Sequence, residues 1–249
     1  MAARALAVLA AYGPQHPSRS LSELARATGL PLSTTHRLVA ELAAWGALAR
    51  RPDGRYEIGR RLWDLGLLAP VSLGLRDIAL PFLQDLSAAT GENAHIAVLD
   101  GTSALYVERI SGSRSVPIVS RSGSRLPLHA TGVGKVLLAH ADEEVVAQVL
   151  ATARRRTAYT VVAPGVLRRQ LADVRRRGHA STSEEMTLGT RSVAVPVTDS
   201  RDRVLAALGL VAGSSRRDLT RLVPALHVAA RGIARAVEAA HLEQEPTGG

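Results

Sequence analysis

The feature that most restricts the fold of this chain is the stretch from Ser20 to Gly46, which predicts two short helices joined by a tight turn. The first helix is expected to end at Gly29, because glycine readily adopts the left-handed conformation of a helix C-cap. Pro31 prevents a direct continuation, since it lacks a backbone N–H. We expect the Ser33 hydroxyl to cap the second helix. This arrangement predicts a helix-turn-helix, and an ordinary helical hairpin is the alternative.

The second predicted helix has two different faces. Its packed face is expected to carry Thr35, Leu38, Val39, Leu42 and Trp45. The outer face carries Ser33, His36, Arg37, Ala40 and Ala44. Hydrogen-bonding groups in the first turn and small residues beyond it suit a helix that enters the major groove of DNA. We predict that Ser33, His36 and Arg37 contact bases, whereas Thr34 and Thr35 support the helix and contact phosphate.

Residues 47–59 predict a β-hairpin next to the two helices. Pro52-Asp53-Gly54 is a turn signal between two short strands, and arginines gather around it. We predict a wing in which Arg51 and Arg55 contact the DNA backbone, with a solvated hairpin as the alternative. The charge distribution supports this prediction. The first 62 residues hold nine arginines and four carboxylates, a net charge of +5, which is more than half of the +9 of the whole chain.

Residues 59–68 predict a short amphipathic connector with Trp63 as its largest apolar side chain. Exposed apolar residues of this kind need a partner surface. We expect that surface to belong to a second subunit, because a dimer can read two DNA half-sites. Packing of Trp63 within its own chain is the alternative.

The chain beyond residue 75 predicts an antiparallel α+β domain, since its strands are joined by hairpin turns and flanked by helices. Helices are expected over residues 75–90, 129–140, 143–150, 165–177 and 219–242. Strands are expected over residues 94–99, 104–110, 116–119, 192–197 and 204–211.

Several classes of function are disfavoured. The chain lacks cysteine, and it has no apolar run of the ~18 residues that a membrane span needs, so we expect a cytoplasmic protein without disulfides. The run Gly132-Val133-Gly134-Lys135 fails as a phosphate-binding loop, because His129 and Val136 occupy required glycine and hydroxyl positions. We find no set of nucleophile, base and oxyanion donors, and we expect no enzyme and no cofactor.

Histidine offers one open question about metal binding. His95 and His129 could converge on a metal ion or a ligand, although no pair of histidines has ligand spacing along a helix. We favour structural histidines and expect no metal site.

Seven stretches together resemble the IclR-type family of bacterial transcriptional regulators over nearly the whole chain. In order they are RALAVLAAY, LPLSTTHRLVAEL, GRYEIG, ALPFLQDLSAATGENAHIAVLDG, RLPLHATGVGKVLLA, RRRGHASTSEE and RSVAVPVTD. The resemblance implies a winged helix-turn-helix over residues 1–60, a linker helix over 61–74 and a GAF-like antiparallel-sheet effector-binding domain over 75–245. It also implies a homodimer or homotetramer on a palindromic DNA operator, whose affinity or activity a small organic ligand modulates.

The resemblance further implies a ligand pocket between the sheet and the loop before the glycine-rich helix. The matching positions are Leu126, Gly132, Val133, Thr182, Ser192, Gly209 and Val211. Some organic-acid binders of the family have serines at the last two positions and an aspartate at that of Thr182, while Ser192 stands where some members have cysteine. We therefore predict a larger or less polar ligand, because a carboxylate finds fewer donors here.

Two alternatives remain open for this half of the chain. In the first, Gly132 and Gly134 allow close packing between helix and sheet and have no role in ligand binding. The domain can also serve only assembly, which would make the protein a constitutive architectural DNA binder.

Overall fold

The chain divides into two compact units, Met1–Leu73 and Gly74–Gly249. The computed structural model describes residues 2–13, 15–67, 74–216 and 218–244. Residues 68–73 of the predicted linker and residue 245 at the predicted domain end lie outside the described residues. No helix within the described ranges has the length and apolar character that crossing a bilayer requires.

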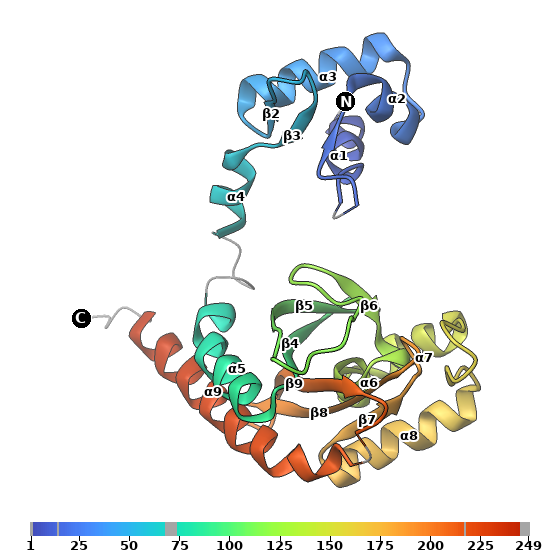
Figure 1. Ribbon diagram of the computed structural model, residues 1–249, viewed down its shortest axis with the longest axis vertical. Coiled ribbons are helices and arrows are strands. Elements are labelled where there is room, and N and C mark those ends of the chain that lie inside the picture. The colour runs from blue at the N-terminus through green and yellow to red at the C-terminus, as the bar shows by residue number, and fades with distance from the viewer. Residues whose placement is uncertain (1, 14, 68–73, 217, 245–249) are drawn as a thin grey trace. The chain divides into compact units, whose positions relative to one another are not determined.

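The first unit is a winged helix-turn-helix (Figure 1). Its helices are α1 (Ala2–Ala10), α2 (Leu21–Thr28), α3 (Leu32–Trp45) and α4 (Arg60–Leu67). The antiparallel sheet has the order β1 (Ser18–Arg19), β3 (Tyr56–Ile58) and β2 (Leu48–Arg50). Its small core consists of Val8, Leu24, Leu38, Val39 and Leu48. The predicted helices and hairpin are confirmed, and α4 confirms the connector as far as Leu67.

Local signals explain where the two central helices begin and end. Ser20 caps α2 through a capping box, in which its N–H donates to the Glu23 carboxylate at 2.8 Å and its hydroxyl accepts from the Glu23 N–H. Gly29 ends α2 with a φ of 68°. The prediction that Ser33 caps α3 is wrong. Pro31 is the N-cap, because its ψ of 145° is still extended and the helix begins at Leu32, so Ser33 already lies in the first turn.

The helical wheel also places Trp45 incorrectly. Its side chain is 42% exposed at the end of α3, rather than packed in the core. The Arg61 guanidinium on α4 stacks over its ring at 4.5 Å and donates to its carbonyl oxygen at 3.1 Å. Trp45 therefore fixes the start of α4 against α3.

The second unit is built on a six-stranded antiparallel sheet with the strand order β6-β5-β4-β9-β8-β7. The strands are β4 (Asn93–Asp100), β5 (Ser103–Ile110), β6 (Arg125–Pro127), β7 (Ala180–Ser183), β8 (Thr190–Thr198) and β9 (Val204–Gly213). The helices are α5 (Leu75–Thr90), α6 (Gly132–Ala139), α7 (Glu143–Thr152), α8 (Pro164–Arg177) and α9 (Val223–Gln244), with 3₁₀ turns η1 (Leu128–Ala130) and η2 (Thr220–Leu222).

Helices cover both faces of this sheet (Figure 1). One core joins α5 and α9 to residues such as Val193, Val195 and Leu208. The other core joins α6, α7 and α8 to the alternate residues, among them Ala194 and Ala207. This alternation, expected for strands, puts His95, Ser192 and Val211 on the α6 face of the sheet.

One predicted strand is wrong. Residues 116–119 run through an irregular loop, in which Pro117 has no N–H for a ladder. The edge position beside β5 belongs to the three-residue strand β6. The helix predicted over residues 129–140 begins only at Gly132, after η1. The remaining predicted elements are confirmed, with ends shifted by a few residues.

Candidate functional sites

The outer face of α3 is available to a partner. The side chains of Ser33, His36, Arg37, Ala40 and Ala44 are exposed on it, and Thr34 is half-buried. Thr35 differs, because it is fully buried and its hydroxyl donates to the Pro31 carbonyl oxygen at 3.0 Å. Thr35 therefore supports the first turn of α3, as predicted, but the predicted phosphate contact is wrong because it has no exposed surface.

The two wing arginines have different roles. The Arg55 guanidinium contacts the Glu23 carboxylate at 2.7 Å and donates to the Ser18 carbonyl oxygen at 3.0 Å. These bonds join the start of β3 to β1 and to α2, so Arg55 positions the wing, and the phosphate contact predicted for it stays a prediction. Arg51 bonds Glu57 at 3.0 Å across the exposed hairpin. Exposed ion pairs of this kind contribute little, which leaves Arg51 able to contact phosphate.

Large apolar side chains are exposed on α4. Trp63 is 60% exposed and Leu65 is 46% exposed. Two residues apart on a helix, these side chains lie on different faces, and Trp63 is the larger apolar surface that a partner can cover.

A pocket lies in the second unit on the α6 face of the sheet. The empty space within it, mouth and open solvent included, is about 410 Å³. Five residues of the predicted set line it, namely Leu126, Gly132, Thr182, Ser192 and Val211. His95, which the sequence offered as a possible ligand contact, also lines it. Sequence reasoning missed the rest of the lining, which comes from Tyr106, Ile118, Val119, Ser120, Ala130, Thr131, Met186, Thr187 and Thr190.

The two other predicted pocket residues lie behind the lining. Val133 is fully buried in the core between α6 and the sheet. A Cβ on Gly209 would lie 3.0 Å from the His95 Nε2 atom and 3.0 Å from the Val133 Cγ1 atom. Gly209 and Val133 therefore shape the pocket from beneath, and their part in ligand binding stays a prediction.

Gly132 and Gly134, at the start of α6, each lack room for a Cβ, but for different reasons. A Cβ on Gly132 would lie 2.6 Å from the Ser192 hydroxyl, at the pocket. A Cβ on Gly134 would lie 2.5 Å from the Leu128 carbonyl oxygen, so Gly134 serves close packing. Thr131 caps the helix by accepting the Gly134 N–H at 3.1 Å.

Neutral polar groups face the pocket. The Thr182 and Ser192 hydroxyls lie 2.6 Å apart across β7 and β8. Burial, and to a smaller extent the nearby Arg109, lowers the pKa of His95 to about 3, so its imidazole is neutral. Burial raises the pKa of Tyr106, whose ring centroid lies 5.1 Å from that of His95. The pocket therefore offers hydrogen bonds without a positively charged side chain among its described lining residues.

The two histidines considered for a metal do not meet at one. His129 bonds the Arg154 carbonyl oxygen through Nε2 at 2.9 Å, and it lines a different cavity from His95. The described residues contain no group of three or more histidine or carboxylate side chains that could hold a metal ion.

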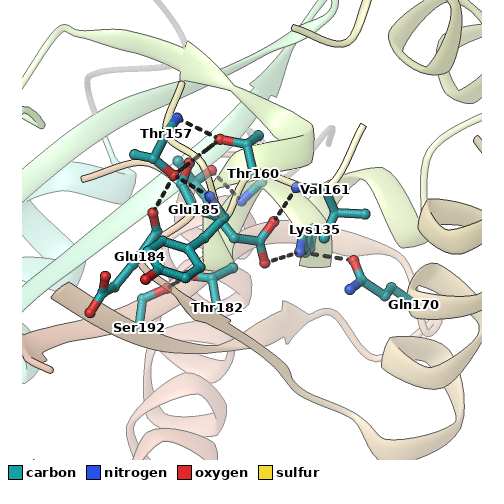
Figure 2. Close-up of polar contacts among 12 residues, drawn as sticks. Lys135, Thr157, Thr160, Val161, Gln170, Thr182, Glu184, Glu185 and Ser192 are labelled. Atoms are coloured by element: carbon teal, nitrogen blue, oxygen red, sulfur yellow. Dashed lines mark hydrogen bonds and ion pairs between the residues drawn. The ribbon is translucent and has the colours of Figure 1, made fainter. Parts of the chain in front are cut away.

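A buried ion pair supports one wall of the pocket (Figure 2). The Lys135 Nζ atom on α6 donates to the Glu185 carboxylate at 2.5 Å and to the Gln170 side chain on α8 at 2.9 Å. Both members of the ion pair are buried, and the pKa of Lys135 is lowered by that burial against the opposing effect of Glu185.

Glu185 lies in the loop between β7 and β8, and hydrogen bonds to the backbone also hold this loop. The Thr157 hydroxyl donates to the Glu184 carbonyl oxygen at 2.6 Å, and the Thr160 hydroxyl donates to the Glu185 carbonyl oxygen at 2.7 Å (Figure 2). The next residues, Met186 and Thr187, line the pocket. Lys135 and the two threonines therefore fix the position of this wall.

Comparison with known proteins identifies the family. The model of the IclR helix-turn-helix domain matches residues 1–52, and the model described as bacterial transcriptional regulator IclR C-terminal matches residues 69–238. This chain belongs to the IclR family. Among its relatives, the regulator XynR of Escherichia coli K12 is 36% identical over 222 residues, 86% of each chain. The transcriptional repressor IclR of the same strain is 32% identical over 218 residues, covering 86% of this chain and 80% of its own length.

Solved IclR structures have the same fold. An IclR homolog from Microbacterium hydrocarbonoxydans, complexed with 4-hydroxybenzoate, superposes with a TM-score of 0.91 and 34% identity, covering 96% of this chain and 99% of its own. The Thermotoga maritima IclR superposes with a TM-score of 0.76 and 28% identity, covering 95% and 98%. The protein is thus an IclR-type, DNA-binding transcriptional regulator with a C-terminal effector-binding domain.

Proposed function

We propose that this IclR-type regulator responds to a small aromatic acid that carries one carboxylate. The lining of the pocket supports this, because the apolar side chains of Ile118, Leu126 and Met186 adjoin neutral hydroxyl and imidazole groups. A single carboxylate can accept the N–H groups at the start of α6 that precede Gly134, whose own N–H is bonded to Thr131. A second carboxylate would find no lysine or arginine among the described lining residues. The related Microbacterium protein, crystallised with 4-hydroxybenzoate, provides the first probe.

Addition of 4-hydroxybenzoate is expected to raise the melting temperature of the protein and to change its affinity for DNA from upstream of its own gene. Malonate, with two carboxylates, is expected to do neither. The melting temperature rises because a ligand that binds only the folded state stabilises it, and the DNA affinity changes if the ligand binds the free and DNA-bound forms with different affinity. Thermal unfolding and fluorescence anisotropy measure them.

A matched variant shows where the ligand acts. Val211→Phe fills the pocket from β9 and should retain DNA binding while it loses the response to 4-hydroxybenzoate. A response to malonate alone would contradict the proposed ligand class.

Arg37 is proposed to contact a guanine from the exposed face of α3, with Ser33 and His36 beside it and Thr34 and Arg51 near phosphate. Arg37→Ala should then weaken operator binding by about 1–3 kcal/mol and relax sequence preference at one base pair. Anisotropy titrations against the operator and single-base variants measure both effects. Arg201→Ala removes the same charge from an exposed turn of the second unit and should change neither. If Arg37→Ala kept the full preference at every base pair, Arg37 would not read the sequence.

We infer that two copies assemble through the exposed face of α4 around Trp63 and bind a palindromic operator. Trp63→Glu should shift the sedimenting mass from dimer toward monomer and weaken operator binding at least about tenfold, because linked half-sites bind together. Val228→Glu alters an equally exposed residue on α9, and the dimer should survive it. A Trp63→Glu protein that stayed dimeric would refute this interface, and a mass of four chains would indicate a homotetramer.

The remaining inferences follow from the role of the protein. A regulator that binds the bacterial chromosome works in the cytoplasm. The curated relatives bear the names of regulators and repressors, and we infer that this chain likewise has no catalytic activity.

A further inference from the structure

His95 lines the pocket and carries a ring nitrogen that has no hydrogen-bond partner among the described residues. It lies on β4 and is only 2% exposed, and its Nδ1 atom has no hydrogen-bond partner among the described residues. Buried polar atoms in folded proteins almost always have partners, so an orphan atom needs an explanation. Since the same side chain lines the ligand pocket, a bound ligand is the partner that the site itself suggests.

The surroundings of His95 hold its ring in one place. Gly209 faces it from β9, where a Cβ would lie only 3.0 Å from the His95 Nε2 atom, so the glycine leaves the volume that the imidazole occupies. The Tyr106 ring packs against it from β5, with an interplanar angle of 39°. The imidazole thus supplies a polar group where position 209 has no side chain.

The charge state of His95 restricts the group it can bind. Burial and the neighbouring Arg109 both disfavour the imidazolium ion. A carboxylate only accepts hydrogen bonds, and it would gain most from a charged ring. A hydroxyl both donates and accepts, so it can pair with the imidazole in either tautomer.

We propose that His95 determines the specificity of this pocket by hydrogen bonding, as a neutral imidazole, to the ring hydroxyl of a hydroxylated aromatic acid. This inference rests on the proposed ligand class of the same site, and it adds which substituent the protein selects and which residue selects it. Benzoate, which lacks the hydroxyl, would leave the imidazole unpaired and should bind less tightly.

The test is a calorimetric titration of 4-hydroxybenzoate and benzoate into the full-length protein and three variants. The wild type should bind 4-hydroxybenzoate about tenfold more tightly than benzoate, the usual size of one neutral hydrogen bond. His95→Phe keeps a ring but no nitrogen, and should bind both compounds equally. His95→Asn returns a polar group near the Nδ1 position and should recover part of the preference. Tyr106→Phe removes the hydroxyl of the ring that packs against His95 and should keep the preference for 4-hydroxybenzoate.

Readouts on the wild-type protein do not depend on how the variants fold. The imidazole ¹⁵N resonances of His95 should move with 4-hydroxybenzoate and much less with benzoate. Benzoate affinity should stay level between pH 8 and pH 5.5, with Arg109 and Tyr106 as the ionisable groups nearest to the ring.

Three results would overturn the inference. If His95→Phe binds 4-hydroxybenzoate with the preference intact, His95 does not select the hydroxyl, although the proposed function survives. If benzoate binds ever more tightly as the pH falls through 6.5, and His95→Phe abolishes that trend, the ring is charged and pairs with the carboxylate. If neither compound binds the wild type, the ligand class and the inference both fail.

Discussion

Lys135→Met is expected to lower the free energy of unfolding of the second unit by about 3–5 kcal/mol, because it leaves the Glu185 carboxylate buried without its partner. The attraction between the two charges mainly offsets the cost of removing both from water. The double variant Lys135→Met with Glu185→Gln carries no buried charge at this place, and its amide can still accept the Val161 N–H. It should therefore recover at least half of the lost stability.

Urea unfolding followed by two signals measures this effect in the intact protein. Both tryptophans, Trp45 and Trp63, lie in the first unit, so tryptophan fluorescence should keep its midpoint while circular dichroism shows an earlier transition. Glu143→Gln breaks the exposed pair with Arg168 and should barely move either midpoint. A double variant as unstable as Lys135→Met would mean that the loss comes from packing and not from the unpaired charge.

The elements that the sequence predicts well are those with local signals. Helices α2, α5 and α8 end at glycines with positive φ, and these ends are visible in the sequence because few other residues accept that conformation. The short strands β1, β6 and β7 give no such signal, since two to four residues have no measurable period. The irregular loop at residues 116–119 shows the reverse error, in which apolar residues imitate a strand around Pro117.

The site residues follow a similar division. The exposed face of α3 could be predicted, because helical periodicity determines which side chains share a face. The role of Arg55 could not, because its partners Glu23 and Ser18 lie more than 30 residues earlier in the chain and meet it only in the folded sheet. His95 was noticed as a histidine, but only the fold shows that it shares a pocket with Ser192 and Val211.

The buried His95 also predicts how the protein responds to acid. Its pKa in the folded protein is about 3, whereas in the unfolded chain it has the ordinary value near 6.5. Below pH 6.5 the His95 side chain therefore binds a proton in the unfolded state but not in the folded state. The free energy of unfolding falls as the pH falls toward 3. Between pH 7 and pH 5 this one group is expected to lower the free energy of unfolding by about 2 kcal/mol.

Comparison of the wild type with His95→Phe isolates this contribution. Burial also lowers the pKa values of His129 and His227, so both proteins should lose stability on acidification, but the variant should lose about 2 kcal/mol less between pH 7 and pH 5. The interval from pH 7 to pH 5 lies above the range in which carboxylates with lowered pKa values titrate. These carboxylates therefore contribute little to the difference in stability loss between the two proteins. Equal losses in the two proteins, measured by urea unfolding at each pH, would show that His95 takes up its proton in the folded state. The imidazole could then bind a ligand carboxylate as a cation, and the hydroxyl selectivity proposed for the pocket would lose its physical basis.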